Sequence, residues 1–172
     1  MQFTPSLRAI ARAGAGVNNI PIDRCSESGI IVFNTPGANA NAVKELVMMA
    51  MLLGSRRVYE AMSWEQSLKG SGDELPKLVE KGKGRFAGPE LKGKALGVVG
   101  LGAIGAQVAN IARHFGMTVY GYDPYISVDN AWMLDKNIIH AQTIEEIYRI
   151  SDYITLHIPA TPNTTGSINA GS

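Results

Sequence analysis

A glycine-rich turn between an apolar run and a helical pattern constrains this chain most strongly. Residues 95 to 99 have the composition of a buried strand, and glycines follow at positions 100, 102 and 105 as a helical pattern begins. In this context Gly100 permits a tight turn, Gly102 lets the backbone approach a pyrophosphate, and Gly105 lets the helix pack closely on the strand. Free N–H groups at the helix start would then hold the phosphates without a basic side chain.

An acidic residue stands where a dinucleotide site requires one. Asp123 lies 23 residues after Gly100, at the end of the next predicted strand. Its carboxylate can accept hydrogen bonds from both ribose hydroxyls of an adenosine, and it would repel a 2′-phosphate. Pro124, Tyr125 and Ile126 follow, with no Arg or Lys to bind that phosphate. The motif therefore favours NAD over NADP, although FAD and S-adenosylmethionine proteins share the architecture.

Length, charge and cysteine content exclude several other classes of protein. At 172 residues the chain is long enough for one domain, or one domain and part of another. Its 16 basic and 15 acidic residues leave a net charge of +1, so a general nucleic-acid interface is disfavoured. The single cysteine, Cys25, excludes an internal disulfide framework and a multi-cysteine metal site. We expect Cys25 to be a packed small residue, and we expect no metal.

Neither a membrane span nor a signal peptide is predicted. The longest apolar stretch, residues 46 to 53, is less than half of the roughly 20 residues that a spanning helix needs. Residues 1 to 10 lack a charged region followed by an apolar block. We therefore expect a cytoplasmic protein with no membrane partner.

Strands and helices alternate in the second half of the chain, which predicts an α/β fold of Rossmann type. Parallel strands connected by helices would give the first half of a Rossmann sheet, in the order 3-2-1-4. We expect strands at residues 95–99, 117–122, 138–140 and 153–158, and helices at 103–115 and 143–150, within a dinucleotide-binding domain covering residues 95–172.

The first half divides into three segments. Residues 1–40 predict a strand, a helix from Pro21 and a buried parallel strand at 30–33, which is part of a second α/β layer. Residues 41–59 predict a helix capped by Asn41 and apolar on all sides, which favours a place between domains or subunits over the core of one domain. Residues 60–94 alternate glycine with lysine and predict a loop-rich connector, solvated rather than anion-binding.

The three histidines differ in their prospects for chemistry. His114 falls late in a helix, and His140 ends a short strand with no pairing signal. His157 lies at the carboxyl end of the last predicted strand, where open α/β sheets bind ligands, so we expect it to touch a cofactor. No arginine or orienting acid accompanies it locally, which argues against a role as catalytic base.

Several stretches together resemble the D-isomer-specific 2-hydroxyacid dehydrogenases. The glycine motif alone is generic, but its combination with the other segments is specific and extends over nearly the whole chain. The resemblance rests on AGAGVNNI at 13–20, NTPGAN at 34–39 leading into VKE at 43–45, GVVGLGAIG at 97–105, YDP at 122–124 and HIPATP at 157–162.

The resemblance implies a two-domain NAD-dependent oxidoreductase, with residues 1–40 belonging to a flavodoxin-like substrate domain. It implies that backbone amides at Ala15 and Gly16 hold the substrate carboxylate, with Ala15 also near the nicotinamide and Asn39 on the substrate side. The helix at 41–59 resembles the interdomain helix of the family, which contributes to a homodimer. The remaining cofactor-binding positions implied are Gly100, Gly102, Ala103, Ile104, Gly105, Asp123, Pro124, His157, Ile158, Pro159 and Thr164.

The catalytic groups of the family define what we expect of this chain alone. Family members use a histidine paired with a glutamate, and an arginine, all of which normally lie beyond the HxPxT segment. The sequence ends at Ser172, shortly after that segment. We therefore expect a partial chain that binds NAD, has no catalytic residue of its own and belongs to an enzyme acting on a small 2-hydroxy acid, with 3-phosphoglycerate as the expected substrate. A catalytically silent NAD-binding regulatory module is the alternative.

Overall fold

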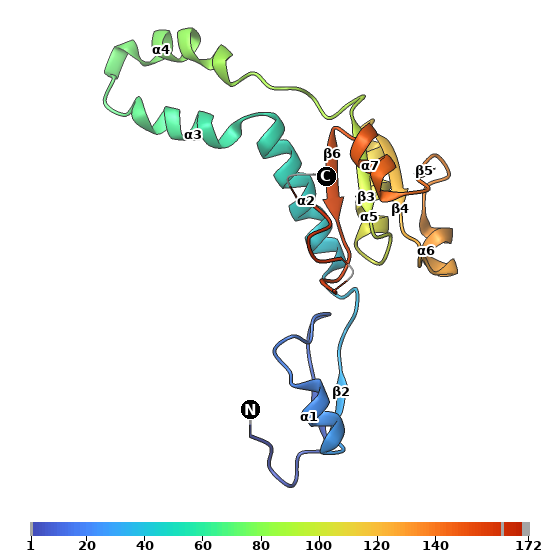
Figure 1. Ribbon diagram of the computed structural model, residues 1–172. Helices are drawn as coiled ribbons and strands as arrows, with labels where there is room; N and C mark the ends of the chain where they lie inside the picture. The colour runs from blue at the N-terminus through green and yellow to red at the C-terminus, as the bar shows by residue number, and fades with distance from the viewer. Residues whose placement is uncertain (1, 163, 170–172) are drawn as a thin grey trace.

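Two separate parallel sheets organise the part of the chain that the structure describes. The computed structural model describes residues 2–162 and 164–169. One sheet has two strands and the other has four. Figure 1 shows the smaller sheet in the N-terminal segment and the larger one in the C-terminal half of the chain, with helices beside it.

The four-stranded sheet has the predicted Rossmann-type order. The strands are arranged β5-β4-β3-β6, and each neighbouring pair is parallel. Numbered along the chain, this order is 3-2-1-4, so the predicted topology is confirmed. The elements are β3 (Ala95–Val99), α5 (Gly105–His114), β4 (Thr118–Tyr122), β5 (Ile139–His140), α7 (Ile144–Ile150) and β6 (Tyr153–Leu156).

Alternating side chains of β3 contribute to the two faces of this sheet. Leu96 and Val98 are buried in the core on one face, which also includes residues of α5 and of the long helix α2 (Ala40–Ser55). Val99 packs on the other face, against Ile147 of α7. Gly97 lies on that second face, where a Cβ atom would come within 2.5 Å of Ile147 Cγ2. Close packing of α7 therefore requires a glycine in the middle of the central strand.

Helix α2 differs from the prediction at both ends. It begins at Ala40 after the N-cap residue Asn39, so Asn41 is inside the helix and donates to Glu45 Oε1 at 2.8 Å instead of capping. It ends at Ser55 instead of continuing to residue 59. Arg57, between this helix and the next, adopts a left-handed conformation with φ of 50°.

A buried polar contact fixes the end of α2 to the sheet. Ser55 Oγ donates to the Met51 carbonyl at 2.6 Å and lies 2.7 Å from the Tyr153 hydroxyl at the start of β6. Gly88 packs so closely here that a Cβ atom on it would overlap the Ser55 carbonyl oxygen. The chain entering β3 is thus packed against the end of α2.

Residues 60–94 are mostly helical, so the predicted loop-rich connector is wrong in its local structure. Helix α3 (Val58–Ser67) and helix α4 (Leu75–Gly82) run away from the sheet in Figure 1, with 3₁₀ turns η1 (Gly72–Glu74) and η2 (Lys83–Phe86). Neither helix buries a residue. Trp64 and Phe86 have ring centroids 5.1 Å apart, and the Arg85 guanidinium lies 4.7 Å from each ring. Contacts among these three side chains, and not a buried apolar core, connect helix α3 to the turn η2.

The N-terminal segment contains the predicted strand, helix and strand. These are β1 (Ala9–Ala11), α1 (Ile22–Glu27) and β2 (Ile31–Phe33), with Cys25 fully buried between Ile20 and Ile30 as expected. The prediction of a buried strand at 30–33 is wrong for its outer residues, because Ile31 is 59% and Phe33 is 56% exposed. Only β1 pairs with β2 among the described residues, and no described layer covers these side chains.

One further helix, α6 (Val128–Met133), was not predicted. Its N-cap Ser127 accepts a hydrogen bond from Asn130 N at 3.2 Å, and none of its residues is buried. Across the described ranges, no helix is both long and apolar enough to cross a membrane. The same residues contain no cluster of His, Cys, Asp and Glu suited to a metal ion.

Replacing Gly88 with alanine should destabilise the fold, because the added methyl would collide with the backbone of Ser55 and not with a movable side chain. We expect a loss of about 2 kcal/mol in the free energy of unfolding, measured by urea denaturation. Gly54→Ala is the matched control, since nothing lies within 4 Å of its Cβ position and the residue is helical. That variant should lie within about 1 kcal/mol of wild type. Equal stability of the two variants would contradict the assignment of close packing.

Candidate functional site

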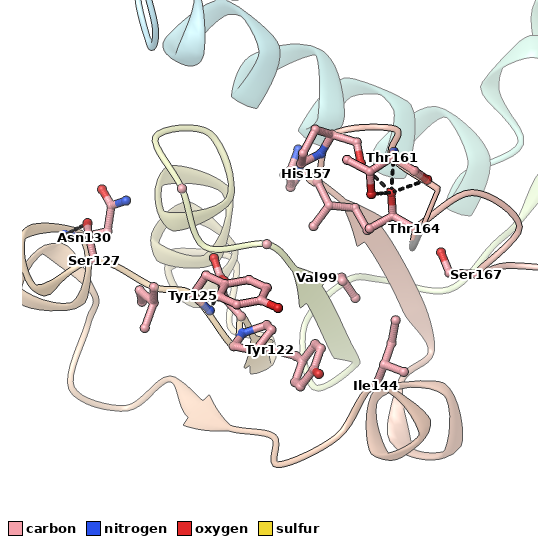
Figure 2. Close-up of a pocket in the computed structure, with 17 residues that line it drawn as sticks. Val99, Tyr122, Tyr125, Ser127, Asn130, Ile144, His157, Thr161, Thr164 and Ser167 are labelled. Carbon is pink, nitrogen blue, oxygen red and sulfur yellow. Dashed lines mark hydrogen bonds between the residues drawn. The ribbon is translucent and has the colours of Figure 1, made fainter.

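A pocket of about 700 Å³ opens at the carboxyl ends of β3, β4 and β6. Figure 2 shows His157, Thr161 and Thr164 on one side of it and Tyr122 and Tyr125 on the other. This edge of an open parallel sheet is where such folds bind ligands. The pocket is lined by Val99, Gly100, Gly102, Tyr122, Asp123, Pro124, Tyr125, Ile126, Ser127, Asn130, Ile144, His157, Ile158, Pro159, Thr161, Thr164 and Ser167.

The three glycines after β3 have three different environments. Gly100 has φ of 88°, and a Cβ atom there would lie 2.7 Å from the His157 carbonyl oxygen. A Cβ atom at Gly105 would overlap the Gly100 carbonyl oxygen. Gly102 has nothing within 4 Å of its Cβ position, yet it lines the pocket. Gly100 and Gly105 are therefore required by the fold itself, whereas the space at Gly102 is left for a ligand.

Backbone donors at the start of α5 are left without partners. Among the described residues, the N–H groups of Gly102, Ala103 and Ile104 make no hydrogen bond. Such groups at a helix N-terminus carry partial positive charge and favour an anion. Together with the open space at Gly102, they form a cradle suited to a pyrophosphate.

Asp123 connects the two loops that approach each other at this edge of the sheet. Its Oδ2 accepts from Leu101 N at 2.8 Å, and its Oδ1 accepts from Tyr125 N at 2.9 Å. The carboxylate therefore holds the glycine loop against the loop that follows β4. Each carboxylate oxygen can accept further hydrogen bonds, so hydroxyl groups of a ribose can still bind.

His157 lies in the opposite wall, directly after β6. Its backbone N–H donates to the Val99 carbonyl at 2.8 Å, and its Nε2 lies 3.0 Å from Thr155 Oγ1. Burial lowers the pKa of the imidazole below its ordinary value of 6.5. The side chain is therefore neutral near pH 7 and forms an uncharged part of the wall.

Eight of the cofactor positions expected from the sequence come together in this pocket: Gly100, Gly102, Asp123, Pro124, His157, Ile158, Pro159 and Thr164. Ala103, Ile104 and Gly105 lie next to it in the chain, where Gly105 begins α5, Ile104 is the N-cap and Ala103 precedes the cap. The expected positions Ala15, Gly16 and Asn39 do not line it. A Cβ atom on Gly37, close to Asn39 in sequence, would lie 3.3 Å from Ala103 Cβ, so the segment leading into α2 approaches the start of α5.

The loop containing Ala15 and Gly16 is held by its own neighbours. Asn34 Nδ2 donates to the Ala15 carbonyl at 2.8 Å, and Arg12 donates to the Gly16 carbonyl at 2.9 Å. Thr35 Oγ1 accepts from Gly14 N at 2.7 Å. The N–H groups of Ala15 and Gly16 have no partner within the described part of the chain. The loop thus presents two adjacent donors that could bind a carboxylate.

Several lining residues were not singled out from the sequence. Tyr122, Ile126, Ser127 and Asn130 belong to the segment around the end of β4, and Thr161 and Ser167 follow β6. The signal that could have found them is positional, because the residues just beyond the carboxyl ends of adjacent parallel strands line the ligand crevice.

None of the histidines is paired with a carboxylate in the described residues. His114 Nδ1 lies 3.0 Å from the Asn110 carbonyl, His140 Nδ1 lies 3.2 Å from Gln142 Nε2, and His157 contacts Thr155. This part of the chain therefore presents a binding site and not a proton-transfer pair.

The lowered pKa of His157 predicts how stability depends on pH. The unfolded chain binds a proton near pH 6.5 and the folded chain only at lower pH, so the free energy of unfolding falls as the pH drops through 6.5 towards the lowered value. In His157→Gln this part of the decrease should disappear, as measured by urea denaturation between pH 5 and 8. His140→Gln, at an exposed position, is the control that should keep it. Identical pH profiles for wild type and His157→Gln would contradict the assignment.

The site corresponds to a known family of nucleotide-binding domains. Residues 48–172 match the model of the D-isomer specific 2-hydroxyacid dehydrogenase, NAD binding domain. The chain is 43% identical over 158 residues to D-3-phosphoglycerate dehydrogenase of Methanocaldococcus jannaschii and 36% identical over 163 residues to the human protein of the same name. These matches cover 92% and 95% of this chain but only 28% of each relative.

Solved structures agree with the sequence relatives. The NAD⁺-bound 3-phosphoglycerate dehydrogenase of Entamoeba histolytica superposes with a TM-score of 0.67 at 34% identity, covering 95% of this chain and 43% of that one. D-Lactate dehydrogenase of Aquifex aeolicus, in complex with NAD and lactic acid, gives a TM-score of 0.72 at 28% identity, covering 93% and 44%. The chain belongs to the D-isomer-specific 2-hydroxyacid dehydrogenase family and carries its NAD-binding domain.

Proposed function

We propose that this chain is the cofactor-binding part of an NAD-dependent dehydrogenase that oxidises 3-phosphoglycerate to 3-phosphohydroxypyruvate, a reaction of serine biosynthesis. The observation that carries the proposal is the set of unpartnered N–H groups at Gly102, Ala103 and Ile104 beside a pocket that also contains Asp123. The choice of 3-phosphoglycerate follows from the names of the relatives, which are 36% to 43% identical to this chain.

The residues present fit a dinucleotide. We assign the pyrophosphate to the free N–H groups of the α5 start, where the open position at Gly102 allows close approach. Asp123 binds the adenosine ribose, with Pro124 beside it, while His157, Ile158 and Pro159 form the opposite wall of the adenosine pocket. When bound, NAD accepts a hydride from the carbinol carbon of the substrate.

We assign the substrate carboxylate to the N–H groups of Ala15 and Gly16. The hydrogen bonds from Asn34 and Arg12 to the carbonyls of this loop hold its backbone in place. Ala15 would also approach the nicotinamide, and Asn39 would lie on the substrate side. Backbone donors that are fixed before binding lose little conformational entropy when the carboxylate arrives.

A catalytically silent NAD-binding module is the competing proposal. It is favoured by one observation, the lack of a histidine–carboxylate pair among the described residues. The two proposals predict the same cofactor and differ in turnover. They are separated by assaying the natural full-length protein for NADH formation from 3-phosphoglycerate, with turnover expected of the dehydrogenase and not of the silent module.

We also propose that the protein is a cytoplasmic homodimer, with α2 in the interface. Met48 of this helix packs into the core, but Leu46, Met49, Leu52 and Leu53 are between 37% and 58% exposed. Some of them line a groove of about 580 Å³ with Ile111 and Phe115. A second copy of the chain, which presents the same apolar side chains, is the partner that this face fits.

Binding of NADH should be at least about tenfold tighter than binding of NADPH, because Asp123 would repel the 2′-phosphate and no described pocket residue is a lysine or arginine. Isothermal titration calorimetry measures both constants. Equal or tighter binding of NADPH would overturn the assignment of Asp123 to the ribose.

Gly102→Ala is the matched test of the pyrophosphate cradle. The fold has room for this methyl group, so thermal stability should stay near that of wild type, while NADH binding should weaken about tenfold or more. Unchanged NADH affinity in a folded Gly102→Ala protein would contradict the assigned cradle.

Sedimentation velocity should show a concentration-dependent dimer, and Leu53→Asp should shift it to monomer, because a carboxylate on this apolar face would be desolvated in the interface. Lys69→Asp, on an exposed position after α3, is the control for added negative charge. A wild-type protein that is monomeric at all concentrations would refute the proposed dimer.

A further inference from the structure

We infer that Thr164 is a positioning residue, whose hydroxyl fixes the backbone wall of the NAD pocket without itself donating a hydrogen bond to the cofactor. The inference rests on the proposed function, since it concerns how that same site is shaped. It assigns a specific role to the second threonine of the segment after β6, which the sequence resemblance placed among the cofactor-binding positions without saying what its hydroxyl does.

The Thr164 hydroxyl lies at the centre of a local cluster of hydrogen bonds, drawn as dashed lines in Figure 2. Its Oγ1 is 2.6 Å from the Pro159 carbonyl oxygen, to which it donates. It accepts from Thr161 N at 2.8 Å and lies 3.0 Å from Thr161 Oγ1. One side chain thus joins the backbone at two points of the same turn.

The number of protons on the Thr164 hydroxyl decides whether this residue can donate to the cofactor directly or acts by positioning the backbone. A threonine hydroxyl has one proton to donate, and of the two carbonyls within reach that of Pro159, at 2.6 Å, is much nearer than that of Thr161, at 3.4 Å. Two donors, the N–H and the hydroxyl of Thr161, already face the Thr164 oxygen. The hydroxyl therefore has no proton left for a ligand while this arrangement holds, so its effect on the cofactor must pass through the backbone.

The segment that Thr164 holds is a wall of the pocket between two fixed ends. At its start His157 N donates to the Val99 carbonyl at 2.8 Å, which ties it to β3. At its far end the Tyr148 hydroxyl of α7 donates to the Ser167 carbonyl at 2.8 Å. Pro159 is exposed and lies between these ends. The bond from Thr164 to the Pro159 carbonyl is what fixes the middle of the wall.

A second threonine bond supports the turn from outside the pocket. Thr165 Oγ1 donates to the Thr161 carbonyl at 2.7 Å, and Thr165 does not line the pocket. The turn is therefore held in part without Thr164. A variant of Thr164 should accordingly keep its fold while losing the position of the Pro159 wall.

The test compares Thr164→Val, which removes the hydroxyl at nearly constant shape, with Thr164→Ser, which keeps it. Thr118→Val is the control, because the Thr118 hydroxyl makes no hydrogen bond among the described residues and lies outside the pocket. We expect the Kd for NADH, measured by calorimetry, to rise about tenfold in Thr164→Val and to change less than about twofold in the other two variants.

The second readout is hydrogen exchange of the Thr161 amide in the protein without cofactor, followed by NMR. This N–H is bonded to the Thr164 hydroxyl, so its exchange should become faster in Thr164→Val and stay slow in Thr164→Ser. Circular dichroism and thermal melting verify that each variant is folded. If Thr164→Val does not fold, Thr164→Ala takes its place in the same two measurements.

The outcomes separate the inference from its alternatives. Faster Thr161 exchange together with weaker NADH binding, both restored by serine, supports positioning. Weaker binding with unchanged exchange would mean direct contact with the cofactor, and faster exchange with unchanged binding would mean a purely structural turn; either result overturns the inference. Failure of wild type to bind NADH would instead overturn the proposed function, and this inference with it.

Discussion

The close approach of helix α5 to strand β3 is the constraint on which the nucleotide site depends. The Gly105 backbone lies so near the Gly100 carbonyl that no side chain fits between them, and Gly100 itself packs against the carbonyl of His157. This contact brings the residues just before α5 to the edge of the sheet, where the N–H groups of Gly102, Ala103 and Ile104 have no hydrogen-bond partner among the described residues. The pocket therefore lies where the backbones of these three residues pack directly against each other, and the end of β6 forms one of its walls.

Asp123 adds a second constraint, because the group suited to a ribose also holds the loop suited to the phosphates. Its two oxygens accept from Leu101 and Tyr125, which come from different connections of the sheet. A carboxylate at this position therefore fixes the distance between the two parts of a dinucleotide site before any ligand binds. Under the proposed function, selectivity against a 2′-phosphate and the shape of the glycine loop depend on one side chain.

The elements around the four-stranded sheet could be predicted because burial imposes a periodic pattern on them. Strand β3 matches its predicted bounds, and helix α7 begins at Ile144, one residue after the predicted start, because Thr143 is its N-cap. Helices α3, α4 and α6 bury no residue. Helix α4 has apolar residues at helical spacing, but it is only eight residues long and lies among the glycines and lysines of residues 60–94, which resemble a loop. The pocket residues around the ends of β4 and β6 were missed for a different reason, because their places depend on strand ends that meet only in the folded sheet.

The two loops assigned to anions share one physical device. In the N-terminal loop, Asn34 and Arg12 occupy the carbonyls of Ala15 and Gly16 and leave the N–H groups unpaired. In the glycine loop, Asp123 takes the N–H of Leu101 and leaves those that follow it. Both loops can therefore attract negative charge through oriented backbone dipoles. A net charge of +1 is compatible with two anion sites, because neither site depends on an excess of basic side chains. Composition alone could exclude a broad nucleic-acid surface, but only the order of the residues reveals sites of this kind.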